Sequence, residues 1–505
     1  MEKRLLLAMF LSFLIMFIWY VAVVPMYHID NKEVINNNLT LAKTQINAEQ
    51  NTLLPESKEN ISTFIFEQDK FKLEFIESRA AIKEIVFKDY PDSKLSLENG
   101  LAIDEPILAF RRINTTNNSV LFQYVDNYKM ITKEFIFSNS SYELWLEINV
   151  QNESKAPLKI NYPLWLGTLN FSSAIAYSQF QEAIIQTQEK TLHTVVRANK
   201  DFPKPEFIGL RNRYFCAIMQ PDKIETTALL RKINGNLVQV GIISKDFNLS
   251  PGEKIKQKFH IYLGPQNLQL IKAVNPQWSA IIYYGTFDAI SQLLIQILDF
   301  IQRLVHNWGL AIIILSITVY FLLFPLTLKQ MRSIKEMQVL QPKIEELRNI
   351  YKNNPQKLNK EIMELYKEHK VNPFGGCLPL ILQIPIFFAL YQALIRSINL
   401  KGAHFLGIKD LSAPDQLLAF KFSLPILGNA INILPILMAI AMFVQQKISS
   451  VGSMNKSAAE QQKIMTLIMP IILAFFFYPM PSGLVLYWLV NNLLMLVHQF
   501  KIRIK

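Results

Sequence analysis

Two hydroxyl side chains, Ser316 and Tyr320, stand inside an uncharged run that extends from Trp308 to Leu328. The run is long enough to cross a bilayer as a helix, and residues four apart in a helix share one face. A face that meets only lipid has no use for two hydroxyl groups, because each buried polar group costs free energy unless it is paired or hydrated. The spacing therefore indicates a polar stripe that either hydrogen-bonds a neighbouring helix or faces water at membrane depth.

Uncharged polar side chains recur in the other apolar runs, whereas carboxylates do not. Gln383 is one such group, and Gln392, Asn432, Asn491 and Asn492 are others, for which we expect hydrogen bonds between helices. Ion- or proton-coupled transporters usually keep Asp or Glu at membrane depth, and the five C-terminal runs hold neither. A secondary transporter is therefore a disfavoured alternative.

The sequence has no pattern typical of a catalytic or metal-binding site. The two cysteines, Cys216 and Cys377, are expected in different environments and predict no disulfide. The seven histidines lack metal-ligand spacing, and we interpret His193 and His260 as ordinary strand residues. We expect no cofactor, no metal and no enzymatic activity. A membrane-anchored carbohydrate-binding protein stays as the second alternative.

Composition predicts a polytopic membrane protein with a water-soluble part. Of the 505 residues 50% are hydrophobic, and the net charge is +12. A signal-anchor span is expected within residues 1–27, since its apolar stretch of about 20 residues is too long for a cleaved signal peptide. The segment "YPMPSGL" divides the last apolar run in two. The further spans are then expected at about 308–328, 373–397, 424–446, 463–480 and 482–500.

Lys and Arg near the span ends place both termini in the cytoplasm. An Asn- and Gln-rich segment, residues 28–60, is expected to be a flexible tether to an outer domain, residues 61–280. Alternating segments such as "YELWLEINV" predict that this domain is an all-β sandwich. In residues 281–307 the period becomes helical, and an amphipathic helix on the outer membrane surface is expected there.

Residues 329–372 are predicted to form a cytoplasmic hairpin of two amphipathic helices joined at "KNNPQ". The hairpin carries ten Lys or Arg residues against six Asp or Glu residues, with Lys329, Arg332 and Lys335 close to the membrane. This mildly basic surface is either simply solvated or a contact for an acidic partner such as ribosomal RNA or a client tail.

From Trp308 to its end the chain resembles the YidC membrane-protein insertases. The resemblance rests on blocks spread over about 200 residues, namely "WGLAIII", "FPLTLKQ", "LQPKI", "VNPFGGCLPLILQIPIF", "ILPILMAIAMF", "QQKIM" and "PSGLVLYWLVNN". It implies a five-helix core, residues 308–505, with a hydrophilic groove open to the cytoplasm and to lipid. It also implies a periplasmic super-sandwich similar to sugar mutarotases, in a protein of the bacterial inner membrane.

The resemblance implies that nascent membrane proteins slide along this groove, alone or beside the Sec translocon, with a ribosome contact through the cytoplasmic loops. Ser316, Tyr320 and Gln383 are then expected to line the groove. An aromatic exit to lipid is expected at Phe387, Phe476 and Trp488. Tyr320 stands where the family ordinarily carries a positive residue, so the client's charge is met either by water in the groove or by Lys329 and Arg332.

Overall fold

The computed structural model describes residues 62–103, 108–172, 178–194, 199–369, 371, 378–424, 428–449 and 456–504. The predicted first span and tether lie outside the described residues. The chain divides into two compact units. The first holds the described residues up to Ile185, with Thr194–Leu210 and Met219–Ile261; the second holds Gln186–His193, Arg211–Ile218 and everything from Tyr262.

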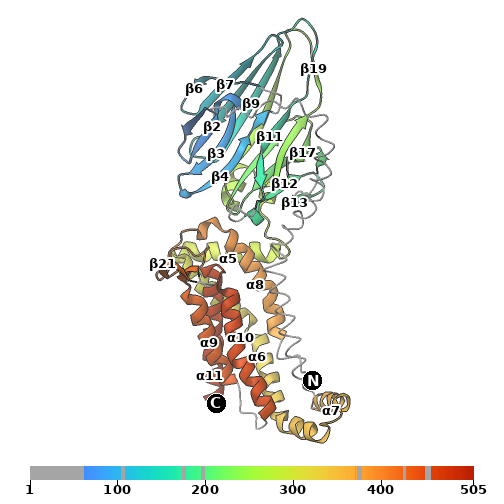
Figure 1. Ribbon diagram of the computed structural model, residues 1–505, viewed down its shortest axis with the longest axis vertical. Helices are drawn as coiled ribbons and strands as arrows, with labels where there is room; N and C mark the ends of the chain where they lie inside the picture. Colours follow the sequence, from blue (N-terminus) through green and yellow to red (C-terminus); the bar gives the residue numbers. More distant parts are fainter. Residues whose placement is uncertain are drawn as a thin grey trace, which may run out of the picture. The chain divides into compact units, whose positions relative to one another are not determined.

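Strands fill the chain from Thr63 to Pro265 (Figure 1). One sheet has the order β1 (Thr63–Glu67), β2 (Phe71–Ile76), β3 (Ala81–Phe87), β4 (Tyr90–Gly100). A nine-stranded sheet has the order β13 (Thr191–Thr194), β12 (Glu182–Gln186), β15 (Phe207–Arg211), β16 (Phe215–Pro221), β20 (Lys254–Pro265), β9 (Glu143–Asn152), β8 (Lys129–Phe137), β7 (Ser119–Val125), β6 (Arg111–Thr115). A five-stranded sheet has the order β14 (Lys200–Pro203), β17 (Thr226–Lys232), β18 (Leu237–Ser244), β11 (Pro163–Asn170), β5 (Ala102–Ile103), and β10 (Leu158–Ile160) pairs with β19 (Phe247–Leu249).

The alternating sequence pattern explains how these sheets pack. Along β8 and β9 every second side chain is buried, because successive residues of a strand point to opposite faces. Rings from two sheets meet in the core: Phe75 of β2 lies 5.7 Å from Phe122 and 5.1 Å from Phe135 between ring centroids. The predicted all-β sandwich is confirmed, including the hairpin of β1 and β2.

Lys133 interrupts the apolar pattern of the buried face of β8, as Lys129 does at the start of the strand. Lys133 of β8 is fully buried, and its ammonium group donates a hydrogen bond of 2.6 Å to the carbonyl of Ala80 and another to that of Leu101. Burial lowers the pKa of Lys133 to about 7. The sandwich thus encloses a titratable group that the sequence pattern did not single out.

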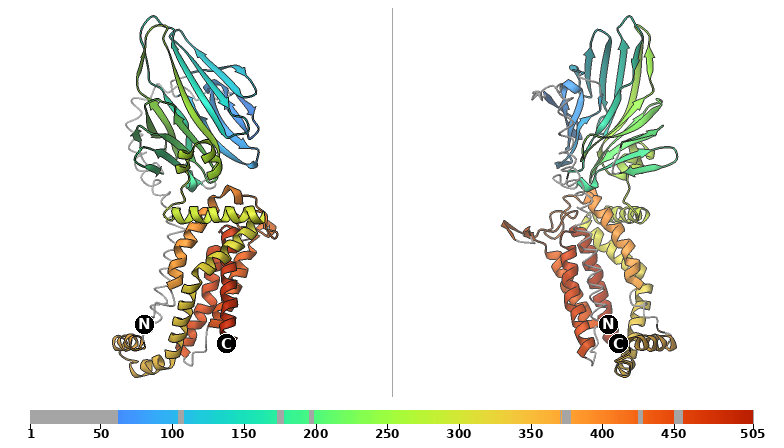
Figure 2. Two further views of the ribbon diagram at one scale, coloured as in Figure 1. Left: turned by 180° about the vertical axis from the view of Figure 1, so that it is seen from behind. Right: turned by 45° about the vertical axis from the view of Figure 1, so that its right-hand side comes forward.

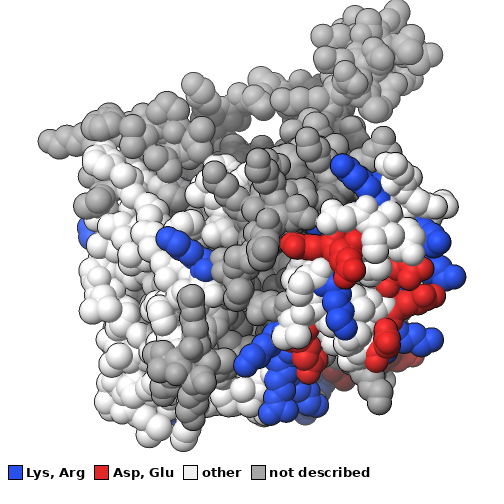
Figure 3. All heavy atoms as spheres, turned by 90° about the horizontal axis from the view of Figure 1, so that it is seen from below, with Lys and Arg blue, Asp and Glu red and all other residues white. Residues whose placement is uncertain are grey.

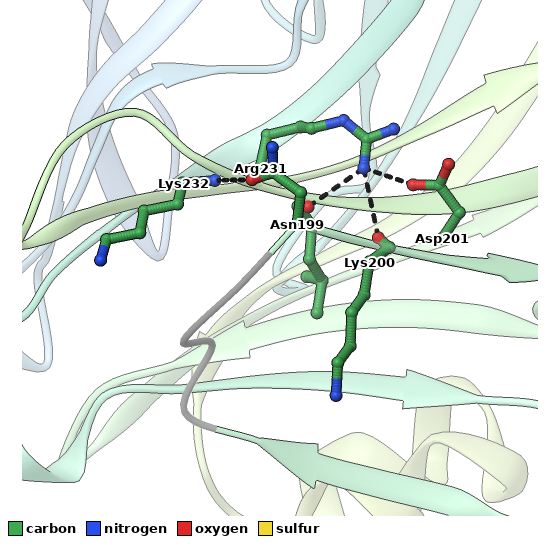
Figure 4. A network of polar contacts seen from close by, with 6 residues as sticks. Asn199, Lys200, Asp201, Arg231 and Lys232 are labelled. Carbon is green, nitrogen blue, oxygen red and sulfur yellow. Dashed lines mark hydrogen bonds and ion pairs between the residues drawn. The ribbon is translucent and has the colours of Figure 1, made fainter.

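At the outer edge of the five-stranded sheet, polar contacts hold β14 against β17. Figure 4 shows Arg231 donating to the carbonyl of Lys200 and to the carboxylate of Asp201. The backbone N–H of Lys232 donates to the side chain of Asn199 over 2.8 Å. These contacts link the edge strand β14 to its neighbour β17.

The second unit is mainly helical. After the short helices α4 (Leu268–Val274) and η4 (Pro276–Ile281) follow α5 (Asp288–Val305), α6 (Trp308–Ile350), α7 (Pro355–Glu368), α8 (Leu378–Arg396), α9 (Ile433–Ser449), α10 (Lys456–Phe477) and α11 (Ser482–Ile504). Trp308–Lys329 and Ser482–Phe500 are long and apolar enough to cross a membrane, while Ile433–Ile448 and Thr466–Phe477 are shorter apolar segments. The helical core is therefore confirmed, and the count of six spans stays a prediction.

Two boundaries differ from the expected ones. The span beginning at Trp308 and the first hairpin helix are one continuous helix of 43 residues, which passes through Pro325 and Pro342. The fourth span was expected from 424, but β21 (Leu418–Leu424) pairs with β22 (Gly428–Ile431) and α9 begins only at Ile433. The carboxylate of Asp415 accepts hydrogen bonds from the N–H groups of Ile433 and Leu434, at 2.6 and 2.8 Å, and so fixes this helix start.

The segment predicted as an amphipathic helix forms α5, which lies across the end of the helices that follow it (Figure 2), and its place on the outer membrane surface stays a prediction. One face packs Leu294, Leu298 and Ile301 into the helical core. In the segment predicted as a cytoplasmic hairpin, Leu340 and Ile344 of α6 pack with residues of α7, and its position in the cytoplasm stays a prediction. These two elements mark the two ends of the helical unit.

Candidate functional site

Ser316 and Tyr320 share a buried face of α6 but differ in what their hydroxyls do. Ser316 is fully buried and donates to the carbonyl of Ile312, one turn earlier, over 2.7 Å. Tyr320 is 9% exposed, and its hydroxyl lies 3.2 Å from Nδ1 of His498. Because the Ser316 proton is already used within its own helix, Tyr320 is the hydroxyl that reaches a second helix.

His498 is a functional candidate that sequence reasoning missed. Its ring stacks on Phe324 at 4.9 Å between centroids and meets Tyr320 from α11. The available signal was that His498 is the one His, Lys, Arg, Asp or Glu residue between Ser482 and Phe500. The lack of metal-ligand spacing among the histidines bears only on metal sites. It says nothing of a single ionisable group at membrane depth.

If the apolar segments of α6 and α11 cross the membrane as predicted, the Tyr320–His498 pair lies in the cytoplasmic half of the core. Tyr320 follows Trp308 by 12 residues, and His498 follows Ser482 by 16 residues. At about 1.5 Å per residue these positions lie roughly 18 and 24 Å from the outer helix ends, within a hydrocarbon layer about 30 Å thick. A ligand from the cytoplasm would therefore reach the pair without crossing the outer half.

Gln383 takes part in a second polar contact, at a different depth along the helices from Tyr320 and His498. Its amide donates to the hydroxyl of Tyr487 over 2.9 Å, and Tyr487 is fully buried. Tyr487 precedes His498 by 11 residues on α11, about 16 Å along the axis. The three predicted groove residues are thus distributed over two levels.

The three aromatic candidates do come together, around Phe477. Phe387 lies 5.5 Å and Trp488 5.2 Å from the Phe477 ring, and Phe476 lies 5.6 Å from it. Phe387 is 9% exposed, so the cluster fills the space between α8, α10 and α11. Phe388 and Phe475, next to two of the predicted residues, are the rings exposed on the outside, at 44% and 50%.

The three predicted basic residues lie on the cytoplasmic extension of α6. Lys329, Arg332 and Lys335 are all exposed. Figure 3 shows Lys and Arg side chains crowded together with Asp and Glu on the side of this face where the hairpin lies. The hairpin surface is therefore mixed in sign, and its basic character is concentrated where α6 leaves the membrane.

The part of the chain that the structure describes has no group of three or more His, Cys, Asp or Glu residues that could hold a metal ion. Cys216 is buried as a free thiol, and burial raises its pKa. Cys377 lies outside the described residues. The site is thus composed of neutral hydroxyls and amides, one imidazole and an aromatic cluster.

Comparison with known proteins matches residues 300–505 to the family described as "60Kd inner membrane protein" and residues 110–297 to that described as "YidC periplasmic domain". The "Membrane protein insertase YidC" of Syntrophobacter fumaroxidans is 37% identical over 73% of this chain and 68% of its own. The protein of that name from Geotalea daltonii is 33% identical over 85% of this chain and 81% of its own. A crystal structure of an active YidC insertase superposes with a TM-score of 0.42 and 18% identity, over 88% of this chain and 93% of that one.

Proposed function

Since the chain belongs to the YidC family of membrane protein insertases, non-enzymatic proteins of the inner membrane, we propose that its clients enter through a hydrophilic groove at Tyr320 and His498. The hydrogen bond between these two side chains is the observation that carries the proposal. It supports the proposal because it brings a phenol and an imidazole together between largely apolar helices, where polar groups need a partner or water.

The groove works by sparing the client a desolvation cost. A charged residue at the centre of a membrane helix costs roughly 2.5–3.5 kcal/mol on the insertion scale. Water and hydrogen-bonding groups in the cytoplasmic half remove part of that cost while the client's polar segment passes. The client's apolar segment then moves into lipid, and its burial there drives the reaction.

His498 supplies the ionisable group of this groove. When Nδ1 accepts the phenol proton of Tyr320, Nε2 carries the ring proton and can donate to a client carboxylate. Ser316, bonded to its own helix, supports the packing of α6 and contributes little to client binding.

The other half of the membrane is proposed to be locally thin. The apolar part of α10 is the 12-residue segment Thr466–Phe477, about 18 Å long as a helix. A segment so much shorter than the hydrocarbon layer thins the bilayer beside it. We place the client's exit at the aromatic cluster of Phe387, Phe476 and Trp488, whose neighbours Phe388 and Phe475 face outward.

Membership of an insertase family implies nascent membrane proteins as substrates. Beyond that, we propose the Sec translocon as a partner for some clients and a ribosome contact at Lys329, Arg332 and Lys335. Six spans, with both termini in the cytoplasm, complete the proposed topology.

The proposal is tested with the double variant Tyr320→Leu and His498→Leu. We expect insertion of a client with a hydrophilic leading segment to slow by about tenfold, equivalent to about 1.4 kcal/mol in the barrier. Tyr320→Arg should retain insertion, since it keeps a polar group in the groove. Insertion is measured as protease protection of the client in inverted membrane vesicles.

Thr318→Leu is the matched control, because Thr318 is exposed on another face of α6 and bonds only its own helix in the same way as Ser316. A cysteine at position 320, in a chain with Cys216 and Cys377 replaced, should react with a polar thiol reagent added from the cytoplasmic side. Equal insertion by the double variant and the control, or an unreactive cysteine, would refute the groove.

A further inference from the structure

A cavity of about 200 Å³ lies beside α5, in the helical unit and away from the proposed groove. Its lining comes from α5, from the start of α4 and from residues 397–399 after α8. Its volume is below the roughly 300–1,000 Å³ of sites for drug-sized ligands. It therefore suits a small polar group rather than a nucleotide or an oligosaccharide.

The position of α5 shows which surface the cavity opens toward. α5 ends three residues before Trp308, where the first described membrane helix begins. Leu293, Phe300 and Leu304 on α5 are 57%, 62% and 67% exposed, although they are large apolar residues. An amphipathic helix with such a face lies in the membrane interface with its apolar side in lipid. The cavity, of which Phe300 is part, thus lies at the level of lipid headgroups.

The charges in the cavity are paired along the helix. Asp299 is half-buried, Arg303 is exposed, and the two lie one turn apart on α5, about 5–6 Å between their Cβ atoms. Burial raises the pKa of the Asp299 carboxyl, against the opposing effects of Arg303 and of a hydrogen bond with Asn399. The half-buried carboxylate of Asp299 can therefore bind a cation inside the cavity. The more exposed guanidinium of Arg303 can bind an anion at the mouth of the cavity.

The remaining polar lining consists mainly of amides. Gln292 and Gln296 bring amide oxygens to the lining, whereas the amide oxygens of Gln266 and Asn267 already accept from Arg211 and from the backbone at the start of α4. A primary ammonium group has three N–H donors for such oxygens. A quaternary ammonium has none and is typically held by cages of aromatic rings. The lining therefore favours a primary amine.

We propose that this cavity binds the phosphoethanolamine headgroup of a phosphatidylethanolamine molecule from the outer leaflet. The ammonium group bonds Asp299 and the amide oxygens of Gln292 and Gln296, the phosphate contacts Arg303, and the acyl chains lie along Phe300 and Leu304. The bound lipid fixes the height of α5 in the interface. Two fixed charges of opposite sign, one helical turn apart at headgroup level, match the two charges of this headgroup.

The test uses the purified full-length protein in detergent, supplied with phosphatidylethanolamine, phosphatidylcholine or phosphatidylglycerol of the same acyl chains. Native mass spectrometry counts the lipid retained. We expect phosphatidylethanolamine to be retained about tenfold more strongly than phosphatidylcholine. Asp299→Asn should reduce that preference to about one, Arg303→Gln should weaken it several-fold, and Asp222→Asn, which removes an exposed carboxylate of the β-domain, should leave it unchanged.

Equal retention of the ethanolamine and choline lipids by the unmodified protein would overturn the proposal. So would tight binding of soluble phosphoethanolamine without retention of the lipid, which would assign the cavity to a free metabolite. Should Asp299→Asn fail to fold, Asp299→Glu keeps the charge and must keep the preference. Lipid retention is measured without a client, so its outcome is independent of the insertion assay for the groove.

Discussion

Two single side chains, Lys133 and His498, lie in very different surroundings. Lys133 is enclosed by the sandwich, where its polar contacts among the described residues are backbone carbonyls and its aromatic neighbours Phe110 and Phe135 lie 5.7 and 5.3 Å away. His498 lies between helices with a phenol as partner. Burial alone sets the first group's protonation, so its effect on stability follows directly from its pKa.

The stability of the sandwich should depend on Lys133 between about pH 7 and 10. The unfolded chain keeps the Lys133 proton up to about 10.5, whereas the folded chain loses it above about 7. The unfolded state therefore binds more protons in this window, and the free energy of unfolding rises with pH by up to about 1.4 kcal/mol per unit. Hydrogen exchange of β8 and β9 in the full-length protein, corrected for intrinsic rates, measures that slope.

Lys133→Met should remove this slope, although it leaves two carbonyls without their donor and can lower stability at high pH. Lys155→Met, at an exposed position, is the control and should retain the slope. An unchanged slope in Lys133→Met would show that another group is responsible for the pH dependence.

Residue types predicted part of the candidate site. Tyr320 was found from the helical spacing of hydroxyls within an apolar run, a local pattern. Its partner His498 is 178 positions away, and the contact follows from the packing of α11 on α6, which no local pattern records. The spacing of hydroxyl residues predicts that Ser316 faces water. It cannot show that a serine in a helix can hydrogen-bond the backbone of its own helix.

At the scale of elements, the periodicity of the sequence predicts whether a segment is a helix or a strand. It predicts the first and last residues of that element poorly. Alternation identified the strands of the sandwich, and the helical stripe identified α5. Composition predicts a helix from residue 424. In the structure α9 begins at Ile433, because β21 pairs with β22 before it and Asp415 caps its start. Both causes are contacts with residues outside the run, so composition alone could not reveal them.

The part of α6 from Lys329 to Ile350, here called the hairpin arm, should contribute to client delivery through its positive charge. Replacing Lys329, Arg332 and Lys335 by Gln removes three exposed positive charges at the membrane end of the arm. We expect delivery of ribosome-bound clients to fall several-fold at low salt and the difference to shrink at high salt, because exposed charges are screened. Delivery is measured as membrane-associated ribosome–nascent-chain complexes.

The matched control replaces three exposed lysines farther along the hairpin, Lys352, Lys360 and Lys367, by Gln. It changes the net charge equally but leaves the arm near the membrane intact. If both triple variants deliver clients equally, the hairpin surface is merely solvated.

For the whole molecule, the division into two units does not follow the order of the chain. Arg211–Ile218, which includes the turn from β15 to β16, belongs to the helical unit. Arg213 in this turn is buried and donates to the carbonyls of Ile395 and Ser412, at 2.7 Å each. A segment flanked by strands thus satisfies backbone groups at the outer end of α8 and in the loop after it.

Arg213→Met should therefore loosen residues 397–417 of the helical unit. Each buried carbonyl left without its donor costs about 1–3 kcal/mol. Limited proteolysis or hydrogen exchange of the purified full-length protein should show faster opening of that loop. Arg231→Met, which removes an arginine from the sheet edge, should not, and equal protection of the loop in both variants would contradict this role for Arg213.

The unbroken course of α6 from Trp308 to Ile350 makes a rod of about 64 Å, with its outer end in the bilayer and its inner end in the cytosol. Pro325 has no N–H for the carbonyl of Phe321, so the helical hydrogen bonding is interrupted a little more than one turn beyond Tyr320, as it is again at Pro342. The ribosome contact proposed at Lys329, Arg332 and Lys335 would therefore apply force to α6 just beyond Pro325, next to the proposed groove.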